Sequence, residues 1–229
     1  AMEGMGIEVE TDTPVEGFEA GDHGAVQAVV AGGRAYPADI VVLGIGVHPA
    51  TSLARQAGLP IGEHGGLRVD DRLQVEGHDA TWAAGDCVES FDRVARALAH
   101  VPLGTHANKQ GRVLGTNLAG GEAVFAGVVR TAISKVCDLE VARTGMREKD
   151  ARRAGLDFVT ATIESTTRAG YFPGAQPMTV KVLAEKPDGR LLGAQIVGRK
   201  GSAKRIDVLA LALWTGQTVG ELAQVDLSY

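Results

Sequence analysis

The chain has 229 residues and a formal net charge of −5, and 45% of its residues are hydrophobic while 22% are charged. This composition is typical of a folded α/β protein, and the negative charge argues against a nucleic acid as partner. No stretch is long and apolar enough to cross a bilayer, and residues 1–9 lack the features of a signal peptide. We therefore expect a cytoplasmic protein whose partners include neither a membrane nor a nucleic acid.

The first part of the chain predicts short strands followed by one buried strand. Residues 1–6 resemble the tail of a helix closed by Gly6, and residues 7–9 and 25–30 alternate as strands do. Residues 38–47, "ADIVVLGIGV", form a continuous apolar run, which is typical of a strand buried on both faces of a parallel sheet. Residues 49–59 predict a helix, with proline near its start and glycine near its end.

The middle of the chain predicts two short strands and a helix. The strands are residues 66–71, "GLRVDD", and 80–86, "ATWAAGD". The helix lies within 102–121, where apolar side chains recur at helical spacing and Thr105 is the expected N-cap. The two cysteines, Cys87 and Cys137, lie far apart in no CxxC pair, so neither a disulfide framework nor a metal ligand is assigned.

From about residue 121 the pattern predicts an antiparallel sheet with helices. Residues 177–198 contain two β-rich runs joined by Pro187-Asp188-Gly189, which predicts a hairpin. Residues 202–216 predict a helix with Ser202 as its cap and Gly216 beyond its end. Thr218 and Glu221 then have the spacing of a capping box. This α+β part has about a hundred residues, a usual domain size.

Gly85 and Asp86 interrupt an apolar run in a way that has two explanations. An acidic residue at the carboxyl end of a strand is well placed to face a ligand, because open α/β sheets bind ligands there. An aspartate in the same place also caps turns. The residues alone favour neither explanation.

Several segments, in order, resemble one family. They are "LGIGVHPAT" (43–51), "WAAGDCVE" (82–89), "VPLGTHANKQGRVLGTNLAG" (101–120), "ISKVCDLEVARTGM" (133–146) and "AGYFPGAQPMTVKVL" (169–183). Together they resemble the pyridine nucleotide-disulfide oxidoreductases, in the group that contains CoA-disulfide reductases and NADH oxidases. The family's first GxGxxG motif and its redox-active cysteine have no counterpart here. We therefore expect the C-terminal portion of a longer protein, as the abrupt ends of the sequence also suggest.

The resemblance implies an α/β plus α+β fold in three parts. Residues 1–48 would be the C-terminal end of an NAD(P)-binding domain, and residues 49–120 the second, returning half of a Rossmann-like FAD-binding domain. Residues 121–229 would be an interface domain with an antiparallel sheet and helices, through which the protein forms a homodimer.

The resemblance also implies roles for individual residues. Asp86 would accept hydrogen bonds from the ribityl hydroxyls of FAD, with Gly85 allowing close backbone approach. The helix start would face the flavin, which favours Leu103, Thr105 and Ala107 as contacts. A plain helix start is the alternative there, and His106 would then be a surface histidine. Further contacts would be Gly46 near the nicotinamide and Asn108 near the substrate.

Two tyrosines would be catalytic by the same resemblance. Tyr171 and Tyr229 would reach across the dimer, where a phenol can hydrogen-bond a thiolate or deliver a proton. The alternative is that both simply pack at the interface. Trp82 and Trp214 are expected in the core.

The expected function is that of an oxidoreductase with FAD as cofactor and NADH or NADPH as co-substrate. It would reduce CoA disulfide or a related persulfide through a cysteine that lies outside this chain. The alternatives are an NADH oxidase or peroxidase of the same family, or a non-catalytic dimerisation fragment when isolated. The isolated chain is expected to be inactive.

Overall fold

A computed structural model describes residues 2–228 of the chain. The chain divides into two compact units, the first ending at Val47 and the second beginning at His48. Among the described residues, none of the helices combines the length and the apolarity that crossing a membrane requires.

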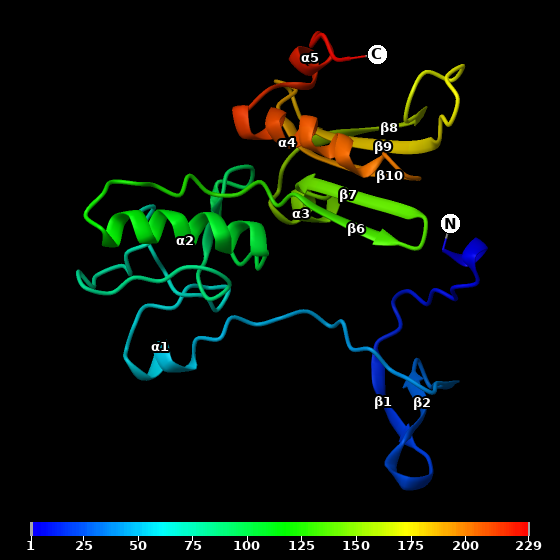
Figure 1. Cartoon of the computed structure of the whole chain (residues 1–229), viewed down its shortest axis with the longest axis horizontal. Coiled ribbons are helices and arrows are strands. Elements are labelled where there is room, and N and C mark those ends of the chain that lie inside the picture. The colour runs from blue at the N-terminus through cyan, green and yellow to red at the C-terminus, as the bar shows by residue number, and fades with distance from the viewer. Residues whose placement is uncertain (1, 229) are drawn as a thin grey trace. The chain divides into compact units, whose positions relative to one another are not determined.

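The first unit contains a small antiparallel sheet. Its strands are β1 (Val15–Ala20), β2 (Val26–Ala31) and β3 (Arg34–Pro37), in the order β1-β2-β3. Figure 1 labels β1 and β2. The predicted helix tail is a single 3-10 turn, Glu3–Met5, which ends at Gly6 with φ of 78°. The strand predicted at 25–30 is confirmed as β2, whereas residues 7–9 form no strand.

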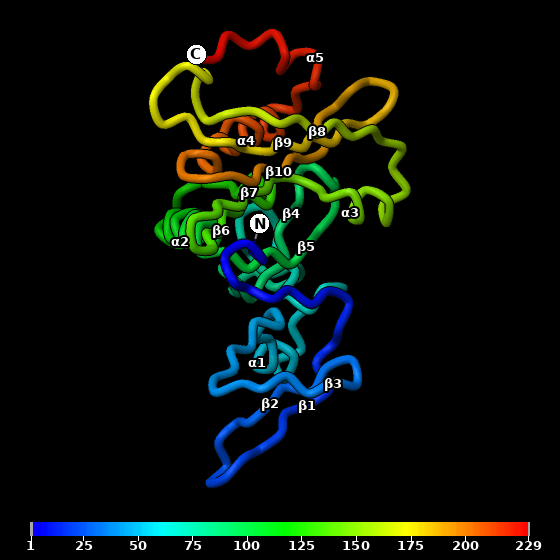
Figure 2. The backbone as a smooth tube through the Cα atoms, turned by 90° about the vertical axis from the view of Figure 1, so that its right-hand side faces the viewer, coloured from blue at the N-terminus to red at the C-terminus, as the bar shows by residue number. Residues whose placement is uncertain are grey.

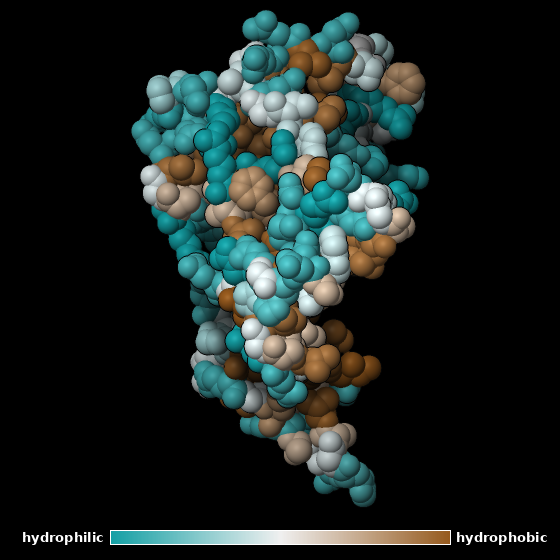
Figure 3. Space-filling model, turned by 90° about the vertical axis from the view of Figure 1, so that its left-hand side faces the viewer, coloured by the Kyte–Doolittle hydropathy of each residue, from teal (hydrophilic) through white to brown (hydrophobic). Residues whose placement is uncertain are grey.

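The buried strand predicted at residues 38–47 is wrong. This segment has no regular secondary structure, and Ile40, Val42 and Ile45 are each more than 80% exposed. A strand in a parallel sheet needs neighbours for its backbone groups and for both faces. Among the described residues, no strand pairs with this segment, although the Ala38 N–H at its start donates a hydrogen bond of 3.0 Å to the Gln27 carbonyl. Figure 3 shows apolar surface gathered in the lower half of the view.

The second unit begins with helix α1 (Ser52–Gln56), as predicted, and continues through irregular segments. The strands predicted at 66–71 and 80–86 are isolated bridges only, such as Leu67 with Val88 and Gln74 with Trp82. These segments nevertheless have their own core. Its buried members are Ala54, Leu67, Val69, Leu73, Val75 and Val88.

A hairpin and a long helix follow. The hairpin consists of β4 (Ser90–Asp92) and β5 (Ala97–Ala99), and the helix is α2 (Gly104–Leu118). The helix is confirmed, but its N-cap is Leu103 rather than Thr105, and no side chain caps it. Thr105 lies inside the first turn. Val113 and Leu114 of α2 pack on the core of the preceding segments.

The C-terminal part is an antiparallel sheet with the order β6-β7-β10-β9-β8 (Figures 1 and 2). Its strands are β6 (Ala132–Val136), β7 (Leu139–Gly145), β8 (Phe158–Thr166), β9 (Pro177–Glu185) and β10 (Leu191–Gly198). The hairpin predicted across residues 187–189 is confirmed as β9-β10. Its helices are α3 (Glu148–Arg153), α4 (Ile206–Thr215) and α5 (Val219–Leu222).

Helix α4 covers β7 and β10 and provides part of the main core. Ile206 and Leu213 of α4 are buried with Leu192 and Ile196 of β10. Gly216 ends the helix with φ of 74°, as predicted. The other end differs, because a 3-10 turn (Ala203–Arg205) precedes the helix and the Ser202 side chain makes no capping hydrogen bond. The capping box of Thr218 and Glu221 is confirmed at α5.

A buried carboxylate joins the β4–β5 hairpin to the segment before β6. Asp92 is 1% exposed, and its Oδ1 accepts hydrogen bonds from the backbone N–H groups of Val94 at 2.8 Å and Ala95 at 3.0 Å. Its Oδ2 forms an ion pair with Arg130. The backbone supports the same junction, because Asp92 also pairs in parallel with Val128.

Replacing Asp92 with Ala is expected to destabilise the protein strongly. The change removes two turn hydrogen bonds and leaves the Arg130 guanidinium without its partner, which costs roughly 3 kcal/mol for a buried pair. Urea denaturation followed by circular dichroism measures the loss. Asp138→Ala is the matched control, because the exposed Asp138 carboxylate lies 3.8 Å from Arg199 in a surface pair and should change stability by about 0.5 kcal/mol or less. Equal losses in the two variants would contradict the role given to Asp92.

Candidate functional site

The turn at Gly85 and Asp86 presents an acidic side chain to solvent. Gly85 has φ of 86°, a left-handed conformation that favours glycine. Asp86 is exposed, and its carboxylate has no hydrogen-bond or ion-pair partner among residues 2–228. Its backbone carbonyl instead accepts a hydrogen bond of 2.8 Å from the His100 ring. The turn is therefore fixed through its backbone while the carboxylate stays available to a ligand.

The Gln110 side chain holds this turn against helix α2. Gln110 is 1% exposed, its Oε1 accepts a hydrogen bond of 2.7 Å from the Gly85 N–H, and its Nε2 donates one of 2.9 Å to the Ser90 hydroxyl. Gln110 was not predicted as a site residue, because a glutamine in a helix is usually solvated. The spacing of the sequence did indicate burial. Gln110 lies three positions after Ala107 and four before Leu114, and residues at these spacings share one face of a helix.

The start of α2 offers hydrogen-bond donors beside the same turn. Within the described residues, the N–H groups of Gly104 and Thr105 have no acceptor, while those of His106 and Ala107 bond the Leu103 carbonyl. Uncapped N–H groups and the positive end of the helix dipole together favour electron-rich or negatively charged atoms. The Ala107 Cβ lies 3.7 Å from the position that a Cβ on Gly85 would occupy. The turn and the helix start are thus in direct contact.

His106 is half-buried at this helix start. Burial lowers the pKa of its imidazole, and this effect is partly offset by the Val101 carbonyl, which lies 3.3 Å from Nδ1. The charge of Lys109 lowers the pKa further, while that of Asp86 raises it. The neutral imidazole is therefore favoured near neutral pH, so His106 adds no positive charge of its own to the site.

The "GEHGG" segment, residues 62–66, has an acidic side chain in its turn instead of a space for phosphate. The Glu89 carboxylate is buried there and accepts a hydrogen bond of 2.7 Å from the His64 N–H. A Cβ at Gly62 or Gly66 would overlap Glu89. These glycines therefore allow close packing around a carboxylate, and a negatively charged turn of this kind does not suit a phosphate group.

The donors and acceptors around Gly85 fit part of a flavin. A carboxylate accepts hydrogen bonds from hydroxyl groups, and free N–H groups at a helix start suit electron-rich ring atoms. The structure brings together five of the predicted cofactor residues: Gly85, Asp86, Leu103, Thr105 and Ala107. Whether they bind a cofactor stays a prediction.

Four further predicted residues are not brought to this turn by any described contact. Gly46 belongs to the first unit, and Asn108 is exposed on α2. Tyr171 is 78% exposed in the loop between β8 and β9, and this loop lies away from α2 in the two backbone views (Figures 1 and 2). Tyr229 lies outside the described residues. Their predicted roles therefore remain predictions.

Replacing Gln110 with Ala is expected to loosen the turn. The change leaves the Gly85 N–H and the Ser90 hydroxyl without their partner and should lower stability by roughly 1–3 kcal/mol. Denaturation measures the loss, and hydrogen exchange should show faster exchange of the Gly85 amide. Arg112→Ala on the exposed side of the same helix is the control. An unchanged rate of amide exchange at Gly85 in the Gln110 variant would contradict the role given to the Gln110 side chain.

His106 should make stability depend on pH. Because the folded protein holds the pKa of His106 below its ordinary value of 6.5, the unfolded chain takes up the proton first as the pH falls. The contribution of His106 to stability is therefore present above about pH 6.5 and is lost as the pH falls below it. The melting temperature of His106→Gln should fall less between pH 7.5 and 5.5 than that of the unchanged protein. An equal fall would contradict the assignment.

Comparisons with known proteins agree with the earlier resemblance. The model of the family described as pyridine nucleotide-disulphide oxidoreductase matches residues 1–102, and the model of its dimerisation domain matches residues 131–227. An NADH oxidase of Methanocaldococcus jannaschii is 35% identical over all of this chain and 50% of its own length. The CoA-dependent NAD(P)H sulfur oxidoreductase of Pyrococcus furiosus is 36% identical over 89% of this chain and 46% of its own length.

A solved structure shows the same fold. The NAD-dependent persulfide reductase from A. fulgidus superposes with a TM-score of 0.95 and 44% identity, over 100% of this chain and 42% of that one. The chain thus spans about half the length of the relatives that it matches. Its fold is that of an α/β plus α+β portion of these enzymes, and the chain belongs to the pyridine nucleotide-disulphide oxidoreductase family.

Proposed function

We propose that this chain is the C-terminal portion of an FAD-dependent oxidoreductase that uses NADH or NADPH to reduce CoA disulfide or a related persulfide. One observation carries the proposal: the Asp86 carboxylate, which has no partner among the described residues, lies on a turn that contacts the start of α2, where N–H groups are uncapped. The names of the relatives support the substrate class, since they include a persulfide reductase and a CoA-dependent sulfur oxidoreductase.

In this proposal, the residues around the turn bind and orient the flavin. Asp86 accepts hydrogen bonds from the ribityl hydroxyls, and Gly85 lets the backbone approach. The N–H groups of Gly104 and Thr105 face the ring, with Leu103 and Ala107 in contact beside them. The bound flavin would supply the two-electron chemistry that links a nicotinamide to a disulfide.

The other assignments follow from the same proposal. Gly46 lies near the nicotinamide, Asn108 near the substrate, and Tyr171 and Tyr229 serve as proton donors in the partner's site. Residues 121–229 form the interface of a homodimer, which the match to a dimerisation-domain model supports. Residues 1–48 and 49–120 belong to the NAD(P)- and FAD-binding domains, and a cysteine outside this chain carries the redox step.

A second candidate is an NADH oxidase, in which the flavin passes electrons to oxygen. The M. jannaschii relative bears that name. The exposed phenol of Tyr171 favours the first candidate, because reduction of oxygen requires no proton donor for a departing thiolate. Isolated from the rest of the protein, the chain acts only as a dimerisation and partial cofactor module.

The proposal is tested by restoring the missing half. We expect the purified chain alone to stay colourless with FAD and to oxidise no NADH, because the GxGxxG segment that holds the flavin pyrophosphate is absent from its sequence. Co-expression with the N-terminal half of the M. jannaschii protein should yield a visible flavin absorbance band and NADH oxidation. Steady turnover by the chain alone would contradict the fragment interpretation.

In the restored protein, Asp86→Ala should weaken FAD binding about tenfold or more, because hydrogen bonds to a charged group contribute about 1.5–3 kcal/mol each. Asp79→Ala, which removes another exposed aspartate, is the control. Undiminished flavin binding by the Asp86 variant would contradict the site.

In the same restored protein, Tyr171→Phe should lower the reduction of CoA disulfide and spare the reduction of oxygen. Equal loss of both activities in this variant would contradict the role of the phenol.

A further inference from the structure

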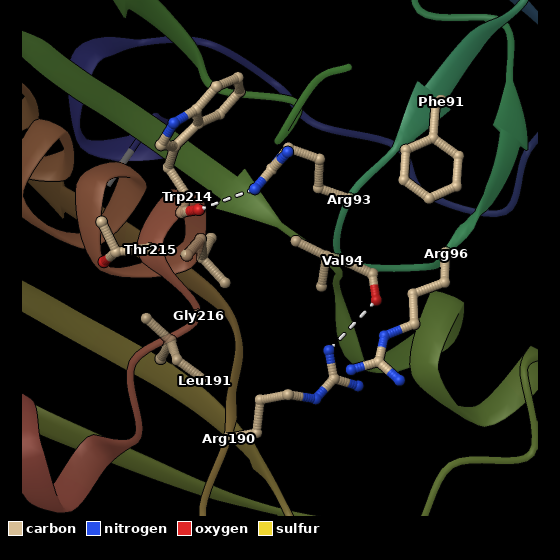
Figure 4. A pocket seen from close by; sticks show the side chains of 10 residues that line it. Phe91, Arg93, Val94, Arg96, Arg190, Leu191, Trp214, Thr215 and Gly216 are labelled. Atoms are coloured by element: carbon tan, nitrogen blue, oxygen red, sulfur yellow. Dashed lines mark hydrogen bonds between the residues drawn. The ribbon is translucent and has the colours of Figure 1, made fainter. Parts of the chain in front are cut away.

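A pocket lies between the tip of the β4–β5 hairpin and the end of α4, and neither Gly85 nor Asp86 lines it. It has a volume of about 430 Å³. Three arginines line it: Arg93 and Arg96 from the hairpin tip and Arg190 from the start of β10 (Figure 4). Arg96 and Arg190 point toward one another in this view. Like charges repel, so an arrangement of this kind calls for a negative charge in the pocket.

The three guanidinium groups are only partly neutralised within the protein. Arg190 pairs with Glu185 at 2.7 Å. Arg93 donates to the backbone carbonyls of Ala126 and Trp214, and its Nε is buried without an acceptor. Arg96 is exposed and has no hydrogen-bond or ion-pair partner among residues 2–228. One carboxylate thus serves three cations, which leaves two positive charges at the pocket.

The hairpin tip holds these arginines in a fixed arrangement. Asp92 fixes the turn through the N–H groups of Val94 and Ala95. Arg96 has φ of 55°, a conformation that costs free energy for any residue with a side chain. On the opposite side of the pocket, the Nη1 of Arg190 donates a hydrogen bond of 3.4 Å to the Val94 carbonyl. The cations are therefore held on two elements that face each other across the pocket.

We propose that this pocket binds the phosphoryl group of a small phosphorylated ligand. A phosphate monoester carries a charge close to −2 near neutral pH and has three terminal oxygens. This charge balances the two uncompensated guanidinium groups. The guanidinium of Arg96 has no acceptor among the described residues, so its N–H groups are available for a bidentate contact with two phosphate oxygens. Arg93 supplies charge at the wall, and Arg190 closes the opposite side.

Trp214 provides a way to observe binding. The prediction that Trp214 lies in the core is wrong, because its side chain is 40% exposed and lines the pocket. The Arg93 guanidinium lies over its ring at 4.4 Å from the centroid. An anion that attracts Arg93 should change this contact and the fluorescence of the indole. In a Trp82→Phe background, Trp214 is the one remaining tryptophan of the sequence.

The test is a fluorescence titration of the full 229-residue chain in that background. Inorganic phosphate and pyrophosphate are added separately, with chloride keeping the ionic strength constant. We expect a saturable change with both anions. Arg96→Gln should weaken the apparent affinity about tenfold or more, since it removes both a positive charge and the charge-assisted hydrogen bonds of the guanidinium.

Arg153→Gln is the matched control, because Arg153 is an exposed arginine on α3 outside the pocket and its loss changes the net charge equally. It should leave the affinity unchanged. A response that does not saturate, or an equal loss of affinity in the two variants, would overturn the proposal. The measurement needs no flavin, so its outcome is independent of the function proposed above.

Discussion

The buried amide of Gln110 is the constraint on which the candidate site depends. A single amide both accepts a hydrogen bond from the Gly85 N–H and donates one to Ser90. A glutamate could not donate to the hydroxyl, and a leucine could make neither bond. Because Gln110 stands on α2, the same contact fixes the helix start relative to the Asp86 carboxylate. The position of a flexible-looking turn is therefore set from the interior of the protein.

Strand β4 connects the turn held by Gln110 to the C-terminal sheet. Ser90 and Asp92 are two residues apart and both buried, the first bonded to Gln110 and the second to Arg130. The strand thus connects the core beneath α2 with the core of the five-stranded sheet, to which Val94 already belongs. Polar contacts fix the relative position of the two cores more closely than apolar packing does. Hydrophobic packing is non-directional, whereas a carboxylate accepts hydrogen bonds only from donors placed at its oxygens.

Local patterns could be predicted from the sequence, and contacts between distant segments could not. The turn at Pro187-Asp188-Gly189 and the capping box at Thr218 depend on residues within a few positions, and both are confirmed. Thr105 was wrong as a cap because the preceding backbone, and not hydroxyl chemistry, decides where α2 begins. The 38–47 segment carries the pattern of a buried strand but pairs with no strand among the described residues. Gln110 was missed because its partners lie 20 and 25 positions away.

The exposed segment at residues 40–47 has a consequence for the behaviour of the chain in solution. Its eight residues, "IVVLGIGV", contain no charge and no proline, and the unpaired backbone of such a stretch readily accepts a strand from another molecule. The colloidal stability of the chain is then limited by this stretch rather than by the folding of its C-terminal sheet. Asp39 already carries a charge at one end of this stretch, so His48 at the other end is the flanking position where added charge would most directly oppose self-association.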